Sequence, residues 1–235
     1  MIDIQVTFPS PIDLAHLEAF HQTIQEEYPL KQRRVKWHGE IKLQAPEPQQ
    51  TVERGPEGFM FRSKDGQRLV QVRQDGFTFN WLKPYPTWTE FRDQARIQWE
   101  AYRSAYRPNR INRLGLRYIN RIEIPLPLDD FRDFVKTAPV LADGLPQGLS
   151  AFLMRCEIPD NDRRILAIIT ETMQPPIDVA DGQRLPLIFD IDVVDTTTYD
   201  DPANSRVWEK FEEMRAYKNE VFFKSVTDRA KEMFR

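Results

Sequence analysis

The 235-residue sequence contains one cysteine, nine glycines and three histidines, and each of these low counts excludes a class of protein. The single cysteine, Cys156, has no partner for an internal disulfide, so we expect a reducing compartment and a cytoplasmic protein. Cys156 lies in a strand-like run, where we expect an inert thiol in the core or the sheet. The glycines form neither a dinucleotide-binding fingerprint nor a phosphate-binding loop, and no Gly-x-Ser-x-Gly motif occurs. The histidines lack zinc-binding spacing, so we expect no metal and no cofactor.

Long hydrophobic runs and an excess of one charge are also missing. No apolar run approaches the ~18 residues of a membrane-spanning helix, and the first residues lack the pattern of an export signal. We therefore expect no membrane partner. With 33 basic and 36 acidic residues the net charge is −3, which argues against general nucleic-acid binding but leaves a local basic stripe open. Fifteen Phe, seven Tyr and five Trp provide ample material for a core.

Alternating apolar and polar residues predict half-buried strands at 2–8 and 35–43, with an amphipathic helix between them. Two stretches are rich in proline and break this alternation. The first, 44–57, is predicted as a surface loop. The second, 125–149, is predicted as irregular apart from a short helix at 129–136.

Turn and cap motifs mark the remaining elements. Asp-Gly pairs at 65–66 and 75–76 supply the positive φ angles of tight hairpins, so we expect three consecutive antiparallel strands over 58–82. Thr87 and Glu90 form a capping box at the start of a helix. Further strands and a long C-terminal helix are predicted at 112–124, 150–158, 164–172, 187–193 and 205–235.

The order strand, helix, strand, loop, strand, strand occurs twice along the chain. This order predicts an α+β fold with a curved, mainly antiparallel sheet, made of two such units, with helices on one face and a long C-terminal helix. Consecutive hairpins leave no room for the crossover helices of a parallel sheet. The pattern fits a single domain over 1–235, and it also fits two similar lobes at about 1–76 and 77–200 followed by the helix at 205–235.

Several motifs together resemble a known family. They include Arg113-Leu-Gly-Leu-Arg-Tyr-Ile-Asn120, Phe189-Asp-Ile-Asp-Val193 and a closing segment that contains Lys218-Asn219. In this combination the chain resembles an uncharacterised bacterial family of about 250 residues that has a GLRYIN motif and a sporadic distribution. The resemblance covers about 58–235 and implies a bacterial cytoplasmic protein. A sporadic distribution is typical of defence or toxin–antitoxin loci. The family has no agreed activity, so the resemblance implies no specific function.

Three arginines are spaced regularly along the predicted strand at 112–124. Arg113, Arg117 and Arg121, called here the arginine ladder, are four residues apart and so project from one face at intervals of about 13 Å. Such a face could bind the phosphates of a nucleic acid or a nucleotide. The alternative is a solvated face balanced by carboxylates, which the overall acidity of the chain favours. With Asn120, these arginines are candidate binding residues.

Two aspartates are the other candidate binding residues. Asp190 and Asp192 alternate with apolar residues, which places both on one face of the last strand, about 6.5–7 Å apart. They could hold Mg²⁺ with a third acid, for which Glu171 and Asp195 are available, or divide acid and base roles. We favour the alternative, an ion-pair network with the arginine ladder, because neighbouring guanidinium groups stabilise the charged carboxylates.

Three hypotheses of function follow from these residues and from the resemblance. The first, which we favour, is a non-enzymatic intracellular binding or interaction module with a protein partner. The second is a carboxylate-dependent, metal-assisted phosphodiesterase or nuclease. The third is a nucleic-acid-binding protein that uses the arginine ladder. All three depend on whether Arg117 and the two aspartates share one polar surface.

Overall fold

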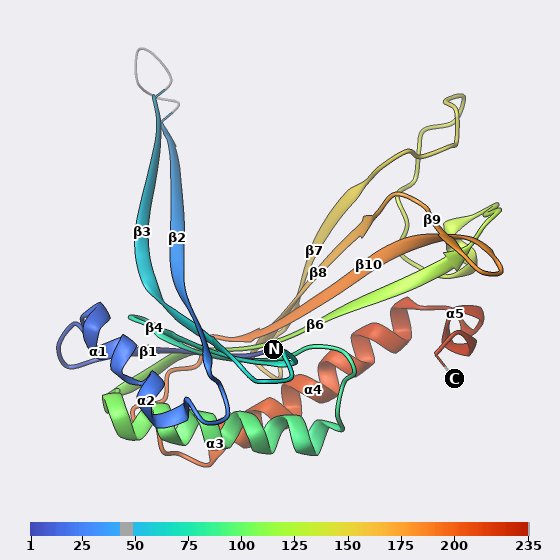
Figure 1. Ribbon diagram of the computed structural model, residues 1–235. Helices are drawn as coiled ribbons and strands as arrows, with labels where there is room; N and C mark the ends of the chain where they lie inside the picture. The colour runs from blue at the N-terminus through green and yellow to red at the C-terminus, as the bar shows by residue number, and fades with distance from the viewer. Residues whose placement is uncertain (43–48, 235) are drawn as a thin grey trace. The chain divides into compact units, whose positions relative to one another are not determined.

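The computed structural model describes residues 1–42 and 49–234 and is an α+β protein with antiparallel strands and a C-terminal helix, as the sequence predicts (Figure 1). The chain forms two compact units. Unit 1 comprises Met1–Arg113 and Thr198–Asn204, and unit 2 comprises Leu114–Thr197 and Ser205–Arg235. Each unit is therefore built from two separate stretches of the chain. Residues 76 and 77, the expected boundary between two lobes, both lie within unit 1.

The strands of each unit are hydrogen-bonded in an order that differs from their order in the chain. In unit 1 the order is β2 (Leu30–Lys42), β3 (Gln49–Arg62), β4 (Arg68–Arg73), β5 (Gly76–Trp81) and β1 (Ile2–Thr7). The neighbour of β1 is β6 (Arg110–Pro125), whose first four residues belong to unit 1 and whose remainder belongs to unit 2. In unit 2 the order is β6, β10 (Gly182–Asp195), β8 (Ile165–Met173) and β7 (Leu153–Asp160), while β9 (Ile177–Val179) pairs with β10.

The helices also divide between the units. Unit 1 contains α1 (Leu14–Ala19), α2 (His21–Ile24) and α3 (Trp88–Tyr106), and unit 2 contains the 3-10 turn η1 (Phe131–Asp133), α4 (Arg206–Ser225) and α5 (Asp228–Glu232). The short helix expected at 129–136 is only the turn η1. The expected single helix at 205–235 is interrupted, because Val226 is extended and forms a β-bridge with Val135, and Thr227 then caps α5.

Both predicted hairpins are confirmed. β3 pairs with β4 across the Asp65-Gly66 turn, and β4 pairs with β5 across the Asp75-Gly76 turn. Gly66 has a φ of +75°, a conformation that other residues rarely adopt. At Gly76, a Cβ atom would lie 2.5 Å from the carbonyl oxygen of Ile4, so the close approach of β5 to β1 requires glycine.

The loop predicted at 44–57 is wrong for most of its length. Residues 49–57 belong to β3, which pairs with β2 as far as Lys42 and Gln49; residues 43–48 lie outside the described part of the chain. The strand forms in a polar, proline-containing sequence because backbone hydrogen bonds to β2 need no apolar side chains. Periodicity alone therefore did not reveal it.

In unit 1 the core lies between the sheet and the helices. Phe77 on β5 contacts Trp99 and Tyr102 of α3, with ring centroids 5.8 and 5.5 Å apart. Phe79 contacts Phe91 of the same helix at 5.7 Å. The helix begins at the predicted capping box, in which Thr87 and Glu90 bond reciprocally.

In unit 2, α4 packs on β10 (Figure 1). Phe222 of α4 meets Phe189 of β10 at 5.9 Å, and Phe189, Ile191 and Val193 are all buried. The intervening residues Asp190 and Asp192 project from the opposite face of the strand. Alternation along β10 therefore separates an apolar face under α4 from a polar one.

Cys156 lies in the sheet, one of the two predicted environments, and not in the core. It lies on β7, the last strand in the order of unit 2, and is exposed. Apolar neighbours in the sequence indicated burial, but β7 has a neighbouring strand on one side only among the described residues, so the sheet covers little of it.

Candidate functional site

The structure brings Arg117 of β6 and Asp190 of β10 together. The Arg117 Nε atom donates to both carboxylate oxygens of Asp190, at 2.9 and 3.0 Å, and its Nη2 atom completes a bidentate ion pair. Asp190 is 8% exposed. Asp192 is the direct register partner of Arg117. The Arg117 guanidinium and the two aspartates therefore share the polar face of unit 2.

The electrostatics of this cluster favour the charged forms. The hydrogen bond to Asp190 raises the pKa of Arg117 above its ordinary value; burial opposes the shift, and the charges of Asp190 and Asp192 reinforce it. The Arg117 guanidinium is already occupied by the Asp190 carboxylate in a bidentate pair. A phosphate would have to displace this carboxylate, which makes the cluster a poor phosphate site.

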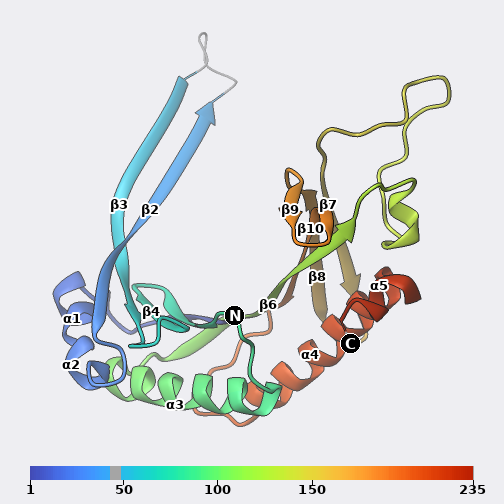
Figure 2. The ribbon, with the colours of Figure 1, turned by 45° about the vertical axis from the view of Figure 1, so that its right-hand side comes forward.

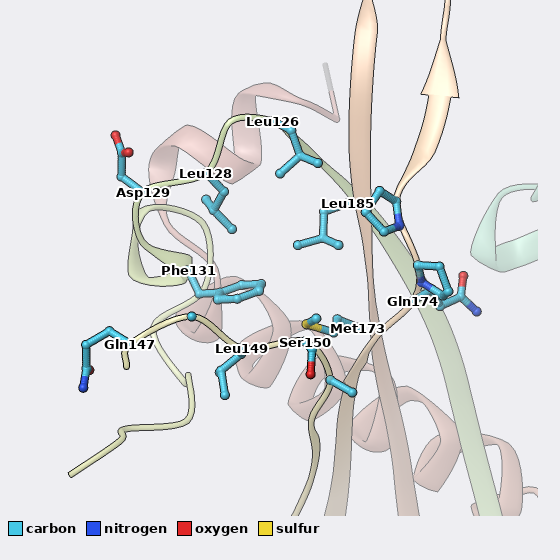
Figure 3. A pocket seen from close by; sticks show the side chains of 14 residues that line it. Leu126, Leu128, Asp129, Phe131, Gln147, Leu149, Ser150, Met173, Gln174 and Leu185 are labelled. Atoms are coloured by element: carbon cyan, nitrogen blue, oxygen red, sulfur yellow. The ribbon is translucent and has the colours of Figure 1, made fainter. Parts of the chain in front are cut away.

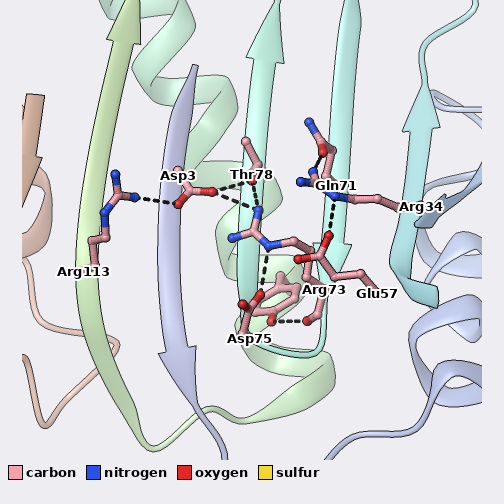
Figure 4. A network of polar contacts seen from close by, with 9 residues as sticks. Asp3, Arg34, Glu57, Gln71, Arg73, Asp75, Thr78 and Arg113 are labelled. Atoms are coloured by element: carbon pink, nitrogen blue, oxygen red, sulfur yellow. Dashed lines mark hydrogen bonds and ion pairs between the residues drawn. The ribbon is translucent and has the colours of Figure 1, made fainter. Parts of the chain in front are cut away.

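The other two ladder arginines have partners of their own. In unit 1, Arg113 donates to Asp3 of β1 at 3.1 Å (Figure 4). In unit 2, the Arg121 guanidinium lies 3.3 Å from Glu123 of the same strand. Each member of the arginine ladder therefore forms an ion pair with a carboxylate.

Asp3 belongs to a larger network on the sheet of unit 1 (Figure 4). It accepts hydrogen bonds from Arg73 at 2.9 Å and from Thr78 at 2.6 Å, and Arg73 also donates to Asp75 at 2.9 Å. Arg73 is only 5% exposed. Burial lowers the pKa of Arg73, but Asp3 and Asp75 more than offset this effect, so its pKa is raised. The network is an ion-pair cluster with a buried centre at Asp3, Arg73 and Thr78, and it joins β1, β4, β5 and β6.

A second cluster lies on the same sheet. Arg34 of β2 donates to Glu57 of β3 at 2.8 Å and also bonds to the side chain of Gln71 on β4 (Figure 4). It links three neighbouring strands through their side chains. Its charges are matched in the same way as those around Arg73, which points to a structural role.

Asn120 does not join Arg117 and the aspartates. Its side-chain amide donates to the backbone carbonyl of Phe189 at 3.0 Å. It alternates with Arg117 and Arg121 along β6, so it belongs to the face that packs under α4. The six predicted binding residues therefore divide among four places: Arg113 in the Asp3 network, Arg117 with the two aspartates, Arg121 with Glu123, and Asn120 on the α4 side of the sheet.

The two acids considered as further metal ligands also lie away from Asp190. Glu171 pairs in register with Phe189, and Asp195 continues the series of Ile191 and Val193, so both project from the α4 face. Asp195 accepts a hydrogen bond from the backbone N–H of Thr197. Within residues 1–42 and 49–234, no group of three or more His, Cys, Asp or Glu residues could hold a metal ion.

Glu171, which the sequence suggested only as a possible third metal ligand, is a buried acid. It is 1% exposed, and its Oε1 atom accepts a hydrogen bond from the Thr137 hydroxyl at 2.6 Å. Burial raises its pKa from 4.5 to about 7, and the bond from Thr137 opposes the rise. Alternation with the buried residues Ile165, Ala167 and Ile169 was the signal that placed Glu171 on the covered face.

Two segments that carry the family resemblance meet on the α4 side of unit 2. The Lys218 amine of α4 lies 4.1 Å from the centre of the Tyr118 ring on β6. Burial and the charge of Arg215 lower the pKa of Lys218 to about 8. The contact is a cation–π interaction that fastens α4 to β6.

Unit 2 also contains a pocket of about 590 Å³, which lies where β6 and β8 end and β10 begins (Figure 3). Apolar side chains dominate its lining. Figure 3 shows Leu126, Leu128, Phe131 and Leu185 directed toward the same space, while the polar ends of Asp129 and Gln147 point away from it. The remaining lining residues are Gly148, Leu149, Ser150, Ala151, Met173, Gln174, Pro175 and Pro176.

The sequence held only a weak signal for this pocket. Much of the lining comes from the proline-rich stretch 125–149, which the sequence predicts to be irregular apart from a short helix at 129–136. Leu126, Leu128, Phe131 and Leu149 are apolar residues in that stretch, and apolar residues in a long connection indicate packing or binding. Their convergence with Met173 and Leu185 depends on tertiary structure.

Comparisons with protein-family models, with curated proteins and with solved structures found no match. The resemblance to a sporadically distributed bacterial family therefore stays a prediction. Among the described residues, no helix is both long enough and apolar enough to cross a membrane.

Proposed function

We propose that this protein is a binding protein whose ligand is a small, mainly apolar molecule held in the pocket of unit 2. The observation that carries the proposal is the pocket itself. Its volume of about 590 Å³ lies within the range of roughly 300–1,000 Å³ that is typical of small-molecule sites. Such sites are mainly apolar with a few polar groups, and this lining has four leucines, a phenylalanine and a methionine beside Ser150 and Gln174.

The charges of the lining restrict the ligand further. Asp129 is the one ionisable residue among the described residues that line the pocket. An anionic ligand would lose its hydration without gaining a positive partner, which is costly. The ligand is therefore uncharged or cationic.

The polar clusters give less support to the two other hypotheses. The arginine ladder is neutralised by carboxylates, which weakens a phosphate-binding role. The acids proposed to complete a metal site with Asp190 and Asp192 lie on the other face of the sheet. A binding function centred on the pocket requires neither group.

Fluorescence titration with two related probes tests the proposal. N-phenyl-1-naphthylamine is neutral and brightens in apolar surroundings, and 8-anilinonaphthalene-1-sulfonate has a similar ring system with a negative charge. We expect the neutral probe to bind at least tenfold more tightly. Leu128→Asn should weaken its binding about tenfold, which corresponds to about 1.4 kcal/mol.

Val140→Asn is the matched control, because Val140 is 88% exposed and belongs to the same connection without lining the pocket. We expect this variant to bind the neutral probe as the wild type does. Circular dichroism verifies that both variants are folded. Absence of binding, equal affinity for both probes, or binding that Leu128→Asn leaves intact would refute the proposal.

A further inference from the structure

The strand β7 is an open edge of the sheet in unit 2. Among the described strands, it pairs only with β8 (Figure 1, Figure 2). Residues 155–158 are exposed on it, and Leu153 is 74% and Ile158 42% exposed. An exposed edge offers unpaired backbone N–H and C=O groups to a further strand. The surface therefore has the chemistry of a strand-pairing site.

The side chains of β7 would face favourable partners if a second copy of β7 were paired with it in the antiparallel direction. In an antiparallel pair of two β7 strands with Cys156 opposite Cys156, Arg155 faces Glu157 of the other copy. In the same register, Met154 faces Ile158 and Leu153 faces Pro159. Opposite charges and apolar pairs directly across from each other stabilise antiparallel strands. We propose that two copies of this chain associate by pairing β7 with β7 about a two-fold axis at Cys156.

Charge also selects this register over its neighbours. With the axis at Cys156, the α4 faces of both copies lie on the same side of the joined sheet. The nearest alternative registers that keep both α4 faces on one side have the axis one residue away, at Arg155 or at Glu157. An axis at Arg155 would place two arginines directly opposite, and an axis at Glu157 would place two glutamates opposite. Like charges across a strand pair are destabilising. Within one chain Arg155 and Glu157 already form an ion pair at 2.5 Å, so pairing would join two such pairs into an alternating group of four charges.

The edge strand of unit 1, β2, has a different distribution of charge. Its first five residues include Lys31, Arg33 and Arg34 and no acidic residue, so a second copy of this segment has no opposite charge to place across from them. Positive charge on an edge is a common means of preventing strand addition. The matched charges and apolar residues of β7 lack this protection, which favours a second copy of β7 as its partner.

Pro159 determines the geometry at the axis. Proline has no N–H, so in a paired edge strand its nitrogen faces away from the neighbouring strand. Pro159 pairs in register with Leu166 of β8, so the outward backbone groups of β7 belong to odd-numbered residues. Cys156 then occupies a non-hydrogen-bonded position, where opposed Cα atoms are about 4.5 Å apart. This separation lies within the range of disulfides, so Cys156 can report on the pairing.

The experiment combines mass measurement with cysteine cross-linking on the full-length protein. Light scattering after size exclusion should show a mass that rises from 27.8 kDa toward twice that value as the concentration approaches ~100 μM. Diamide should then convert the two opposed thiols to one disulfide, itself taking up the two protons and two electrons released. A covalent dimer should appear on a non-reducing gel.

Charge exchange separates this register from any other contact. Glu157→Arg places arginines opposite each other and should reduce the dimer more than tenfold, while the double variant Arg155→Glu, Glu157→Arg restores opposite charges and should restore it. Arg33→Glu on β2 is the control and should behave as the wild type. A monomer at every concentration, a dimer unaffected by Glu157→Arg, or a loss that the double variant does not rescue would overturn the proposal.

Discussion

Replacement of the buried acid Glu171 by glutamine tests the electrostatics of the core of unit 2. The change removes the ionisable group and keeps nearly the same shape, and the amide oxygen can still accept the hydrogen bond from Thr137. At pH 5 the wild-type carboxyl is protonated in the folded state, so the two proteins should differ little in stability. At pH 8 the wild type holds a buried negative charge that the variant lacks.

The size of the effect follows from the difference in pKa between the folded and unfolded states. The folded state keeps its proton up to pH values near 7, and the unfolded chain releases it near 4.5. Stability from this group is therefore complete below pH 4.5 and is lost as the pH rises through 7. At about 1.4 kcal/mol for each pKa unit, the wild type should lose about 2.5 kcal/mol between pH 5 and pH 8 through Glu171.

Urea unfolding at intervals from pH 4.5 to pH 8.5, followed by circular dichroism, measures the effect. The wild-type free energy of unfolding minus that of Glu171→Gln should fall by about 2.5 kcal/mol from pH 5 to pH 8. Asp162→Asn removes an exposed carboxylate and should keep the pH dependence of the wild type. Parallel pH profiles for the wild type and Glu171→Gln would refute the assignment of a raised pKa to Glu171.

Two further substitutions test individual interactions by urea unfolding at pH 7. Asp190→Asn weakens the partly exposed pair with Arg117 and should lower the free energy of unfolding by roughly 1 kcal/mol. The control Asp200→Asn, at an exposed ion pair with Arg110, should lower it by less than about 0.5 kcal/mol. Equal losses would contradict a stabilising role for the Arg117 pair. Thr87→Ala removes the N-cap of α3 and should cost about 1 kcal/mol, which Thr87→Ser should largely avoid. An unchanged unfolding midpoint in Thr87→Ala would show that the cap does not stabilise the helix.

Features that depend on a few adjacent residues could be predicted from the sequence. The Asp-Gly turns and the capping box at Thr87 are local, because the backbone angles and hydrogen bonds that they need are supplied within four residues. The face of Asp190 and Asp192 followed from simple alternation. The same rule places Asn120 on the face of β6 opposite to that of Arg117. Its inclusion with Arg117 among the binding residues therefore conflicted with the alternation used for the aspartates.

Features that depend on strand order could not be predicted. Arg113 and Arg117 have the spacing of one ladder, yet their partners come from different strands, Asp3 of β1 and Asp190 of β10. Cys156 has apolar neighbours, and only its position on the last strand of unit 2 exposes it. The pocket forms from a connection and two strand ends that are distant in the sequence, so no single segment contains its pattern.

The discontinuous composition of the units has a consequence for how the protein is made. Ile111 and Tyr199 form a β-bridge within unit 1, so this unit still lacks a part when the first 198 residues have left the ribosome. Unit 2 is likewise incomplete until α4 and α5, which follow the second stretch of unit 1, have been synthesised. Neither unit can therefore be completed from one continuous stretch of chain during synthesis. For the same reason, no single cleavage of the chain would release either unit intact.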